Sequence, residues 1–419
     1  MSKWNSVILG DYIDIITDYH ANGAYEKLKE NITLKYENDF AIMIRTLNFE
    51  SNDFRDKLIY LNEREYNYLE KTKVQPYDII MNKIANPGTV YLMPDLKRPV
   101  SLAMNLFLIR FKSSVHQRFI FYLMKFNEGY IKLFANGTAT KSITKDAVRA
   151  LKFKIPDFST QSQISKILSD LDAKIELNNK INAELEAMAK LIYDYWFVQF
   201  DFPNEEGKPY KSSGGKMVWN EELKREIPEG WALKKLNSLL NVGKDQINPL
   251  NEPSKVFKHL SIPIFDSTGS YAEELGHQIG SNKFILEKND LAVSKLNPWF
   301  NRVFYPIEVE NLICSTEMVV WKCENKETKN FYFQLSKSQN FISYCTQVAT
   351  GTSNSHKRVN PAVMMQYNIA YNKSLVLEYG KIVDPWISKI MTNKKENKKL
   401  AELRDWLLPM LMNGQVKVS

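Results

Sequence analysis

The sequence predicts an α+β protein in which a mixed, β-rich domain followed by a long helix is written twice. The first observation is a repeated Gly-Thr loop, FANGTATKSI at residues 134–143 and VATGTSNSHKR at 348–358. The second is that short strand-like runs precede each loop, and the third is that a long helical period follows it. Self-similarity on this scale predicts two similar domains, each with its own helix.

Composition narrows the class of partner. Lys and Arg exceed Asp and Glu by a formal charge of +8, and the sequence pI is about 9.0, which favours a polyanionic partner. We expect no membrane span, because no stretch approaches ~18 consecutive apolar residues. Three cysteines without CxxC spacing indicate reduced thiols in a cytoplasmic protein rather than a disulfide frame or a metal site.

The strand-like runs of the two halves correspond in order. Residues 78–83, DIIMNK, are matched by residues 290–295, DLAVSK, and each run ends on a lysine. The apolar runs at 106–109 and 318–321 are both followed by a basic residue. Short apolar runs of this kind predict buried strands, so both halves should hold the same sheet.

The first long helix is predicted to start near Thr160, which stands in capping-box spacing with Gln163. The second is predicted to start at Asp384-Pro385, a typical N-cap followed by a first-turn proline. Each helix carries a heptad seam with two asparagines in its middle, which predicts that the helices pair in a fixed register. The first seam is Ile164, Leu168, Leu171, Ile175, Asn178, Asn182, Leu185 and Ile192, and the second is Val383, Trp386, Ile390, Asn393, Asn397, Leu400 and Leu407.

We therefore expect five segments. These are a first β-rich domain at 1–155, a first long helix at 156–200, a Gly-, Ser- and Pro-rich connector at 201–229, a second β-rich domain at 230–375, and a second long helix with a C-terminal tail at 376–419. The first helix is acidic and the second is basic, which favours pairing between them over self-pairing.

The Gly-Thr loops are the main candidates for a binding site. Glycine permits close backbone approach, and short polar and basic side chains can reach phosphates or base edges. Strand-end lysines and two early-domain loops are further candidates. The candidate DNA-contacting residues are Arg45, Asn48, Lys83, Thr138, Thr140, Lys141 and Ser142 in the first half, and His259, Ser261, Lys295, Thr352, Asn354, Ser355, His356, Lys357 and Arg358 in the second.

No pattern recommends catalysis. Residues 297–300, NPWF, differ at one position from the stretch with which adenine methyltransferases hold a flipped base, but no glycine-rich turn accompanies them to seat a cofactor. A turn after the strand that ends at Lys295 accounts for these residues better. The five histidines lack ligand spacing, so we expect neither catalytic residues nor a metal site.

Taken together, these segments resemble the specificity subunit of type I restriction-modification systems. The resemblance covers nearly the whole chain, and its most specific parts are residues 137–197, IPEGW at 227–231 and LLPMLMNGQV at 407–416. It implies two target recognition domains, each reading one half of a split, asymmetric site in double-stranded DNA. It also implies that the two long helices form an antiparallel coiled coil with pseudo-two-fold symmetry, which spaces the domains and docks two methyltransferase subunits.

The resemblance further implies that restriction and translocase subunits join this core. The chain itself would be non-catalytic and need no cofactor, since S-adenosylmethionine, ATP and Mg would belong to the partner subunits. The second half departs from the first, because its loop is expected to be one residue longer and Pro409 is expected to interrupt its last helical turn. Two alternatives stay open: a self-contained adenine methyltransferase or nuclease, and a coiled-coil scaffold that binds only protein.

Overall fold

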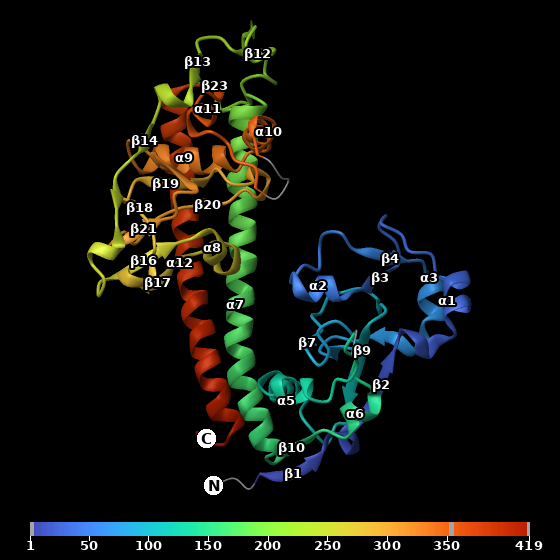
Figure 1. The fold of residues 1–419 in the computed structure, drawn as a ribbon. Helices are drawn as coiled ribbons and strands as arrows, with labels where there is room; N and C mark the ends of the chain where they lie inside the picture. The colour runs from blue at the N-terminus through green and yellow to red at the C-terminus, as the bar shows by residue number, and fades with distance from the viewer. Residues whose placement is uncertain (1–3, 139, 352–355, 417–419) are drawn as a thin grey trace. The chain divides into compact units, whose positions relative to one another are not determined.

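The computed structural model describes residues 4–138, 140–351 and 356–416. The chain forms two compact units: residues 1–176 with 396–419, and residues 177–395. Each unit contains one β-rich domain and part of both long helices (Figure 1). The unit boundaries therefore cross the helices and do not coincide with the predicted domain boundaries.

The first domain is built on two four-stranded sheets, in the orders β2-β9-β6-β7 and β4-β3-β8-β5. A third, two-stranded sheet pairs β1 with β10 and brings the start and end of the domain together. The strands are β1 Asn5–Ile8, β2 Ile13–Asp18, β3 Ala41–Ile44, β4 Ile59–Leu61, β5 Lys73–Val74, β6 Ile79–Asn82, β7 Val90–Leu92, β8 Val100–Leu102, β9 Leu106–Phe111 and β10 Lys152–Ile155.

The second domain repeats this topology. Its sheets have the orders β14-β22-β19-β20 and β15-β18-β21-β16-β17, and β13 pairs with β23 as β1 pairs with β10. The two domains therefore share the order of four strands in each large sheet, and the second domain adds β15. The strands are β13 Ala232–Lys235, β14 Asn241–Gly243, β15 Gln246–Ile247, β16 Val256–Leu260, β17 Ala272–Leu275, β18 Lys283–Ile285, β19 Asp290–Ser294, β20 Val303–Phe304, β21 Leu312–Cys314, β22 Met318–Lys322 and β23 Asn368–Tyr371.

The shorter helices correspond only in part between the domains. In the first domain they are α1 Tyr25–Asn31, α2 Thr46–Glu50, α3 Glu63–Tyr68, α4 Gln117–Phe126, α5 Glu128–Lys132 and α6 Lys145–Arg149. In the second they are α8 Ile262–Thr268, α9 Lys326–Ser336, α10 Gln339–Val348 and α11 Pro361–Met364. Helix α2 follows β3 and helix α8 follows the equivalent strand β16, so the two domains share a β-strand-to-helix turn.

A buried ion pair is duplicated with the sheets. Arg110 binds Asp78 across β6 and β9, at 2.6 Å, and Lys322 binds Asp290 across β19 and β22, at 3.1 Å. Both carboxylates are almost fully buried. A buried carboxylate is tolerated only when it is paired, which explains why each strand-like run begins with aspartate and its partner strand ends with a basic residue.

Helix α7 covers Phe158–Tyr193 and begins two residues before the predicted start. The reason is that Asp157, not Thr160, acts as the cap, since the backbone N–H of Thr160 donates to Asp157 Oδ1 at 2.9 Å. A carboxylate cap is as good as a hydroxyl cap and also suits the positive end of the helix dipole.

Helix α12 covers Lys373–Met412, and both expectations for its prolines are wrong. The helix does not begin at Asp384-Pro385, because Asn372 caps it earlier and Val376, Tyr379 and Val383 are fully buried along its first turns. It also continues through Pro409. A proline removes one helical hydrogen bond, but the buried face of α12 holds the helix together.

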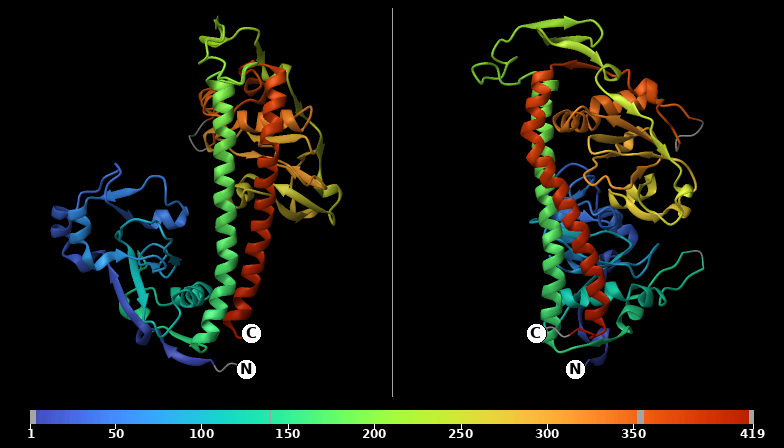
Figure 2. Two further views of the ribbon diagram at one scale, coloured as in Figure 1. Left: turned by 180° about the vertical axis from the view of Figure 1, so that it is seen from behind. Right: turned by 90° about the vertical axis from the view of Figure 1, so that its left-hand side faces the viewer.

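The two long helices run antiparallel within each unit (Figure 2). In the first unit Arg404 binds Asp172 at 2.7 Å, and Leu168 and Leu411 are buried in one apolar core. In the second unit the Tyr379 hydroxyl donates to the carbonyl of Ala189 at 3.0 Å. Contacts therefore pair residues early in α7 with residues late in α12.

The asparagines occupy the seam as polar residues inside an apolar contact. Asn393 is fully buried and donates from Nδ2 to Asn182 Oδ1 at 2.9 Å. All fifteen predicted seam residues are shielded from solvent. Ile164, Leu168, Asn178, Asn182, Val383, Ile390 and Asn393 are buried, and Leu171, Ile175, Leu185, Ile192, Trp386, Asn397, Leu400 and Leu407 are half-buried.

The connector predicted at 201–229 is not a simple linker. It contains a hairpin of β11 Met217–Asn220 and β12 Arg225–Pro228. Phe200, Phe202 and Ile227 are buried in the apolar core of the second unit. The turn residues in the sequence thus mark tight turns within a packed segment.

Within the described part of the chain, no helix is long and apolar enough to cross a membrane.

We expect Asn182→Leu to lower the free energy of unfolding by about 1–3 kcal/mol, because it leaves the buried Asn393 amide without its acceptor. The double variant with Asn393→Leu should recover this loss or exceed wild-type stability, since two leucines pack without a buried polar group. Urea unfolding measures both effects. Thr392→Leu, on the exposed side of α12, is the control and should shift stability by less than about 0.5 kcal/mol. An unaffected Asn182→Leu variant would show that the contact is dispensable.

Candidate nucleic-acid interface

The first Gly-Thr loop is closed at its base by backbone hydrogen bonds. Asn136 and Ser142 exchange two of them, at 2.9 and 2.8 Å. The N–H of Ile143 then donates to the carbonyl of Lys83, at the end of β6. Lys83 in turn donates its N–H to the carbonyl of Asn105, so the loop is fixed to the ends of two strands.

The second loop has the same attachment. Thr350 and Arg358 exchange two backbone hydrogen bonds, at 2.9 and 2.8 Å, and Val359 donates to the carbonyl of Lys295 at the end of β19. Lys295 donates its N–H to the carbonyl of Glu317. The first pair encloses residues 137–141 and the second encloses 351–357, which is two residues longer rather than the predicted one.

Glycine is required at the start of each loop. A Cβ atom on Gly137 would lie 2.4 Å from the carbonyl oxygen of Thr140, and one on Gly351 would lie 2.7 Å from that of His356. Gly137 also has a φ of +127°, which L-residues with side chains rarely adopt. The shared glycine therefore belongs to the scaffold that folds the loop.

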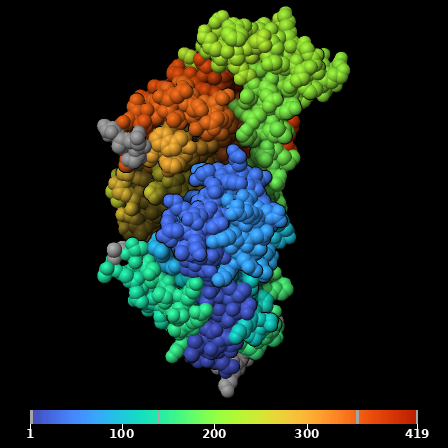
Figure 3. Space-filling view, turned by 90° about the vertical axis from the view of Figure 1, so that its right-hand side faces the viewer, coloured from blue at the N-terminus to red at the C-terminus, as the bar shows by residue number. Residues whose placement is uncertain are grey.

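The first loop projects from the edge of its domain (Figures 2 and 3). Thr138, Thr140 and Lys141 are exposed, and Ser142 is half-buried. In the second loop His356 is exposed and Lys357 is half-buried, while Thr352, Asn354 and Ser355 lie outside the described residues. The structure thus leaves the described polar tips of both loops accessible to a ligand.

A buried carboxylate supports the first loop. Asp18, at the end of β2, accepts from Lys83 Nζ and Lys145 Nζ, each at 2.8 Å. Burial raises the pKa of Asp18, but the hydrogen bonds and charges of Lys145 and Lys83 outweigh it and leave the pKa below its usual value. Both lysines remain partly exposed, so two cations are held in fixed positions beside the loop.

A different set of side chains supports the second loop. The Asn297 side chain accepts from the backbone N–H of Lys357 at 2.9 Å, and Arg358 Nε donates to Glu317 at 2.9 Å. Lys295 is half-buried at the strand end. None of Asp18, Asn297 and Glu317 was predicted as a site residue, since each acts through contacts with residues far away in the sequence.

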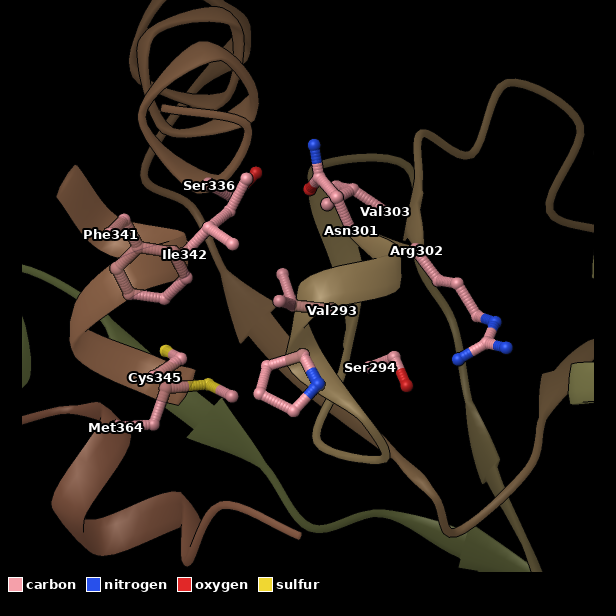
Figure 4. A pocket seen from close by; sticks show the side chains of 11 residues that line it. Val293, Ser294, Asn301, Arg302, Val303, Ser336, Phe341, Ile342, Cys345 and Met364 are labelled. Atoms are coloured by element: carbon pink, nitrogen blue, oxygen red, sulfur yellow. The ribbon is translucent and has the colours of Figure 1, made fainter. Parts of the chain in front are cut away.

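The role of Asn297 argues against a base-binding motif at 297–300. The side chain is buried and already holds Lys357. The cavity beside Pro298 measures only about 10 Å³ (Figure 4), room for about one water molecule. Arg302 lines this cavity, but its guanidinium extends away to bind Asp266 (Figure 4). No flipped base fits here.

Two first-domain candidates form a helix cap instead of a free surface. Asn48 is 3% exposed, accepts from the backbone N–H of Arg45 and donates to the carbonyl of Asp53. The prediction of DNA contact by Asn48 is therefore wrong, because both ends of its amide close this turn. Arg45 remains partly exposed and donates to the carbonyl of Lys57 at 2.6 Å.

The two candidates near the end of β16 in the second domain are also engaged. The His259 ring is buried and hydrogen-bonded to Glu274. Burial lowers the pKa of His259 although Glu274 opposes the shift. Ser261 caps α8 by accepting from the backbone N–H of Ile264. Contact of DNA with the His259 ring is contradicted by its burial, and the Ser261 hydroxyl has a structural role.

Among the residues that the structure describes, no group of three or more His, Cys, Asp or Glu side chains is placed to hold a metal ion.

Comparisons with known proteins agree on one family. Residues 1–187 match the model of the type I restriction modification DNA specificity domain. The chain is 24% identical to the HindI specificity subunit of Haemophilus influenzae over 99% of this chain and 100% of that one. It is 23% identical to the MjaIX specificity subunit of Methanocaldococcus jannaschii over 86% of this chain and 84% of the relative.

A solved structure shares the fold. The S subunit of a type I restriction-modification system from M. genitalium superposes with a TM-score of 0.60 at 17% identity, over 98% of this chain and 96% of that chain.

Gly137→Ala should destabilise the first domain by about 1–3 kcal/mol, because the new Cβ meets the Thr140 carbonyl in a strained backbone conformation. Thermal unfolding checks this. Gly129→Ala is the matched control, because a Cβ at Gly129 in α5 meets nothing within 4 Å and alanine favours a helix. Equal stability of the two variants would contradict the proposed need for glycine.

Acid should weaken the support of the first loop. The Asp18 carboxylate has a lowered pKa when folded, so the stability that it contributes is present above its unfolded pKa of about 3.9 and is lost as pH falls through the folded value. Asp18→Asn should remove this part of the pH dependence. The measurement is the difference in unfolding free energy between pH 6 and pH 2.5 for both proteins; identical differences would exclude a role for the ion pairs.

Proposed function

We propose that the chain is a specificity subunit of a type I restriction-modification system, and that each of its β-rich domains reads one half of a split sequence in double-stranded DNA. As a specificity subunit the chain is the non-catalytic, DNA-recognising component of its system. One observation carries the bipartite reading: two loops are attached identically to equivalent strands but present different side chains. Two loops that are attached in the same way but carry different side chains are suited to reading two different DNA sequences.

The exposed cations and hydroxyls of the loops support contact with DNA. Lys83 and Lys145 in the first domain, and Lys357 in the second, are placed to attract phosphates. Thr138, Thr140 and Lys141 are exposed and are the candidates for contact with base edges. The seam of the long helices sets the spacing between the two readers in this proposal.

Methyltransferase subunits are the partners that the family implies, and both long helices offer a surface for them. Met188, Leu191 and Tyr195 form an exposed apolar stripe at the end of α7 and just beyond it. Leu403 and Trp406 form a stripe on α12. These residues recur at the repeat offset, since 403 − 188 and 406 − 191 are both 215. Two equivalent stripes support docking of two methyltransferase subunits, one per stripe.

The partner subunits are also proposed to hold the cofactors. S-adenosylmethionine would bind the methyltransferases, and ATP and Mg²⁺ would bind the restriction and translocase subunits. The alternative of a self-contained methyltransferase is not favoured, since Asn297 supports a loop and the adjacent cavity has no room for a base.

The experiment that tests bipartite reading is an exchange of residues 1–155 for another first domain. In cells that carry the methyltransferase partner, mapping of methylated adenines should show one half of the site changed and the other retained. A change in both halves would refute independent reading. Methyl transfer by the purified chain alone, supplied with DNA and S-adenosylmethionine, would refute the non-catalytic assignment.

Leu191→Asp and Trp406→Asp should each reduce the number of bound methyltransferase subunits from two to one, because a charge in an apolar interface is costly to bury. The mass of the assembled complex, measured by light scattering, reports this. Ala232→Asp adds the same charge at an exposed position of β13, outside both long helices, and should leave the complex intact. Unchanged mass in both stripe variants would show that the stripes are not the docking surfaces.

A further inference from the structure

The first domain holds an open cavity of about 400 Å³. It lies where β3 passes into α2, with Met43 and Leu28 in its buried part. The neighbouring turn between β8 and β9, where Met104 and Asn105 lie, also lines it. A cavity of this volume is large enough for a nucleobase or a similar planar group.

The cavity lies beside the support of the first loop. The carbonyl of Asn105, which lines the cavity, accepts the backbone N–H of Lys83. Tyr19, also in the lining, directly follows the Asp18 carboxylate that holds Lys83 and Lys145. DNA bound by the loop and these lysines would therefore pass close to the mouth of the cavity.

The chemistry of the cavity suits an apolar group attached to a polyanion. Tyr25, Leu47 and Met104 are 55%, 53% and 45% exposed at its edge. The charged residues in its lining are Lys29 and Arg45, with no Asp or Glu among them. Exposed apolar side chains in a cluster indicate a binding surface. The two basic residues at its rim attract a polyanion such as DNA.

Two apolar positions of this cavity are occupied by polar residues in the second domain. Ala103 donates its N–H to the carbonyl of Ile44, and Ser315 donates to that of Leu260, both at 2.9 Å. This register places His259 where the first domain has Met43, and Thr316 where it has Met104. These two positions are thus apolar in the first domain and polar in the second, whereas Leu47 corresponds to Pro263, which is apolar.

We propose that this cavity is a thymine-reading site: the half-site of the first domain contains a thymine whose 5-methyl group contacts Leu47 and Met104. The proposal rests on the proposed function and names one recognition contact within it. Thymine is the base that presents an apolar group in the major groove, so apolar side chains at a reading surface select it.

The test uses the complete complex of this chain with its methyltransferase subunits, on a duplex whose half-sites are known from methylation mapping. Each thymine is replaced in turn by uracil, which removes only the methyl group. At one thymine of the first domain's half-site, the replacement should lower the affinity of the complex for the duplex about fourfold, which is the contribution of one buried methyl group. With Leu47→Gln or Met104→Gln this difference should shrink toward zero.

The matched control is Ile8→Gln, which removes an apolar side chain of similar exposure, 44%, from β1 in a separate sheet. It should retain the full effect of uracil. The proposal is overturned if no thymine of that half-site is sensitive, or if Leu47→Gln weakens methyltransferase binding in the absence of DNA. A wild-type complex that prefers no DNA sequence would refute the proposed function itself, whereas specific binding without a thymine effect would refute only this inference.

Discussion

The hydrogen bond between each loop and a strand-end lysine is the constraint on which both candidate sites depend. Ile143 is tied to Lys83 and Val359 to Lys295 through the backbone. Because these bonds use no side-chain atoms, they hold the loop in place whatever residues follow its first glycine. The side chains of the loop are consequently available for recognition. The side chains that support each loop, such as Asp18 and Asn297, differ between the two domains.

The parts of the fold that follow local periodicity could be predicted from the sequence. The heptad seam, including the contact of Asn182 with Asn393, follows from a spacing that the chain keeps over many turns. The duplicated strands were also predictable, because buried strands are written as short apolar runs. The start of α12 was not: the local signal at Asp384-Pro385 is strong, but burial of Val376 and Tyr379 extends the helix far upstream of it.

The site was only partly predictable, for a physical reason. The loops could be found because they repeat, whereas their supports could not. Asp18 contacts Lys145, which lies 127 residues away, and no local pattern encodes such a contact. Asn48, His259 and Ser261 had the right chemistry for DNA, but their polar atoms close turns or pair inside the domain. Residue type alone cannot separate these roles.

The difference in length between the loops shows how such a protein can change. Closing a loop of seven residues instead of five costs only about 0.3 kcal/mol of chain entropy. The two backbone hydrogen bonds at the base are the same in both domains, so a change in loop length leaves the packing of the sheets unaltered. Insertions and deletions between these bonds are therefore almost neutral for folding. A lineage of such chains can try new recognition loops, in length as well as in sequence, without first having to re-stabilise the domain.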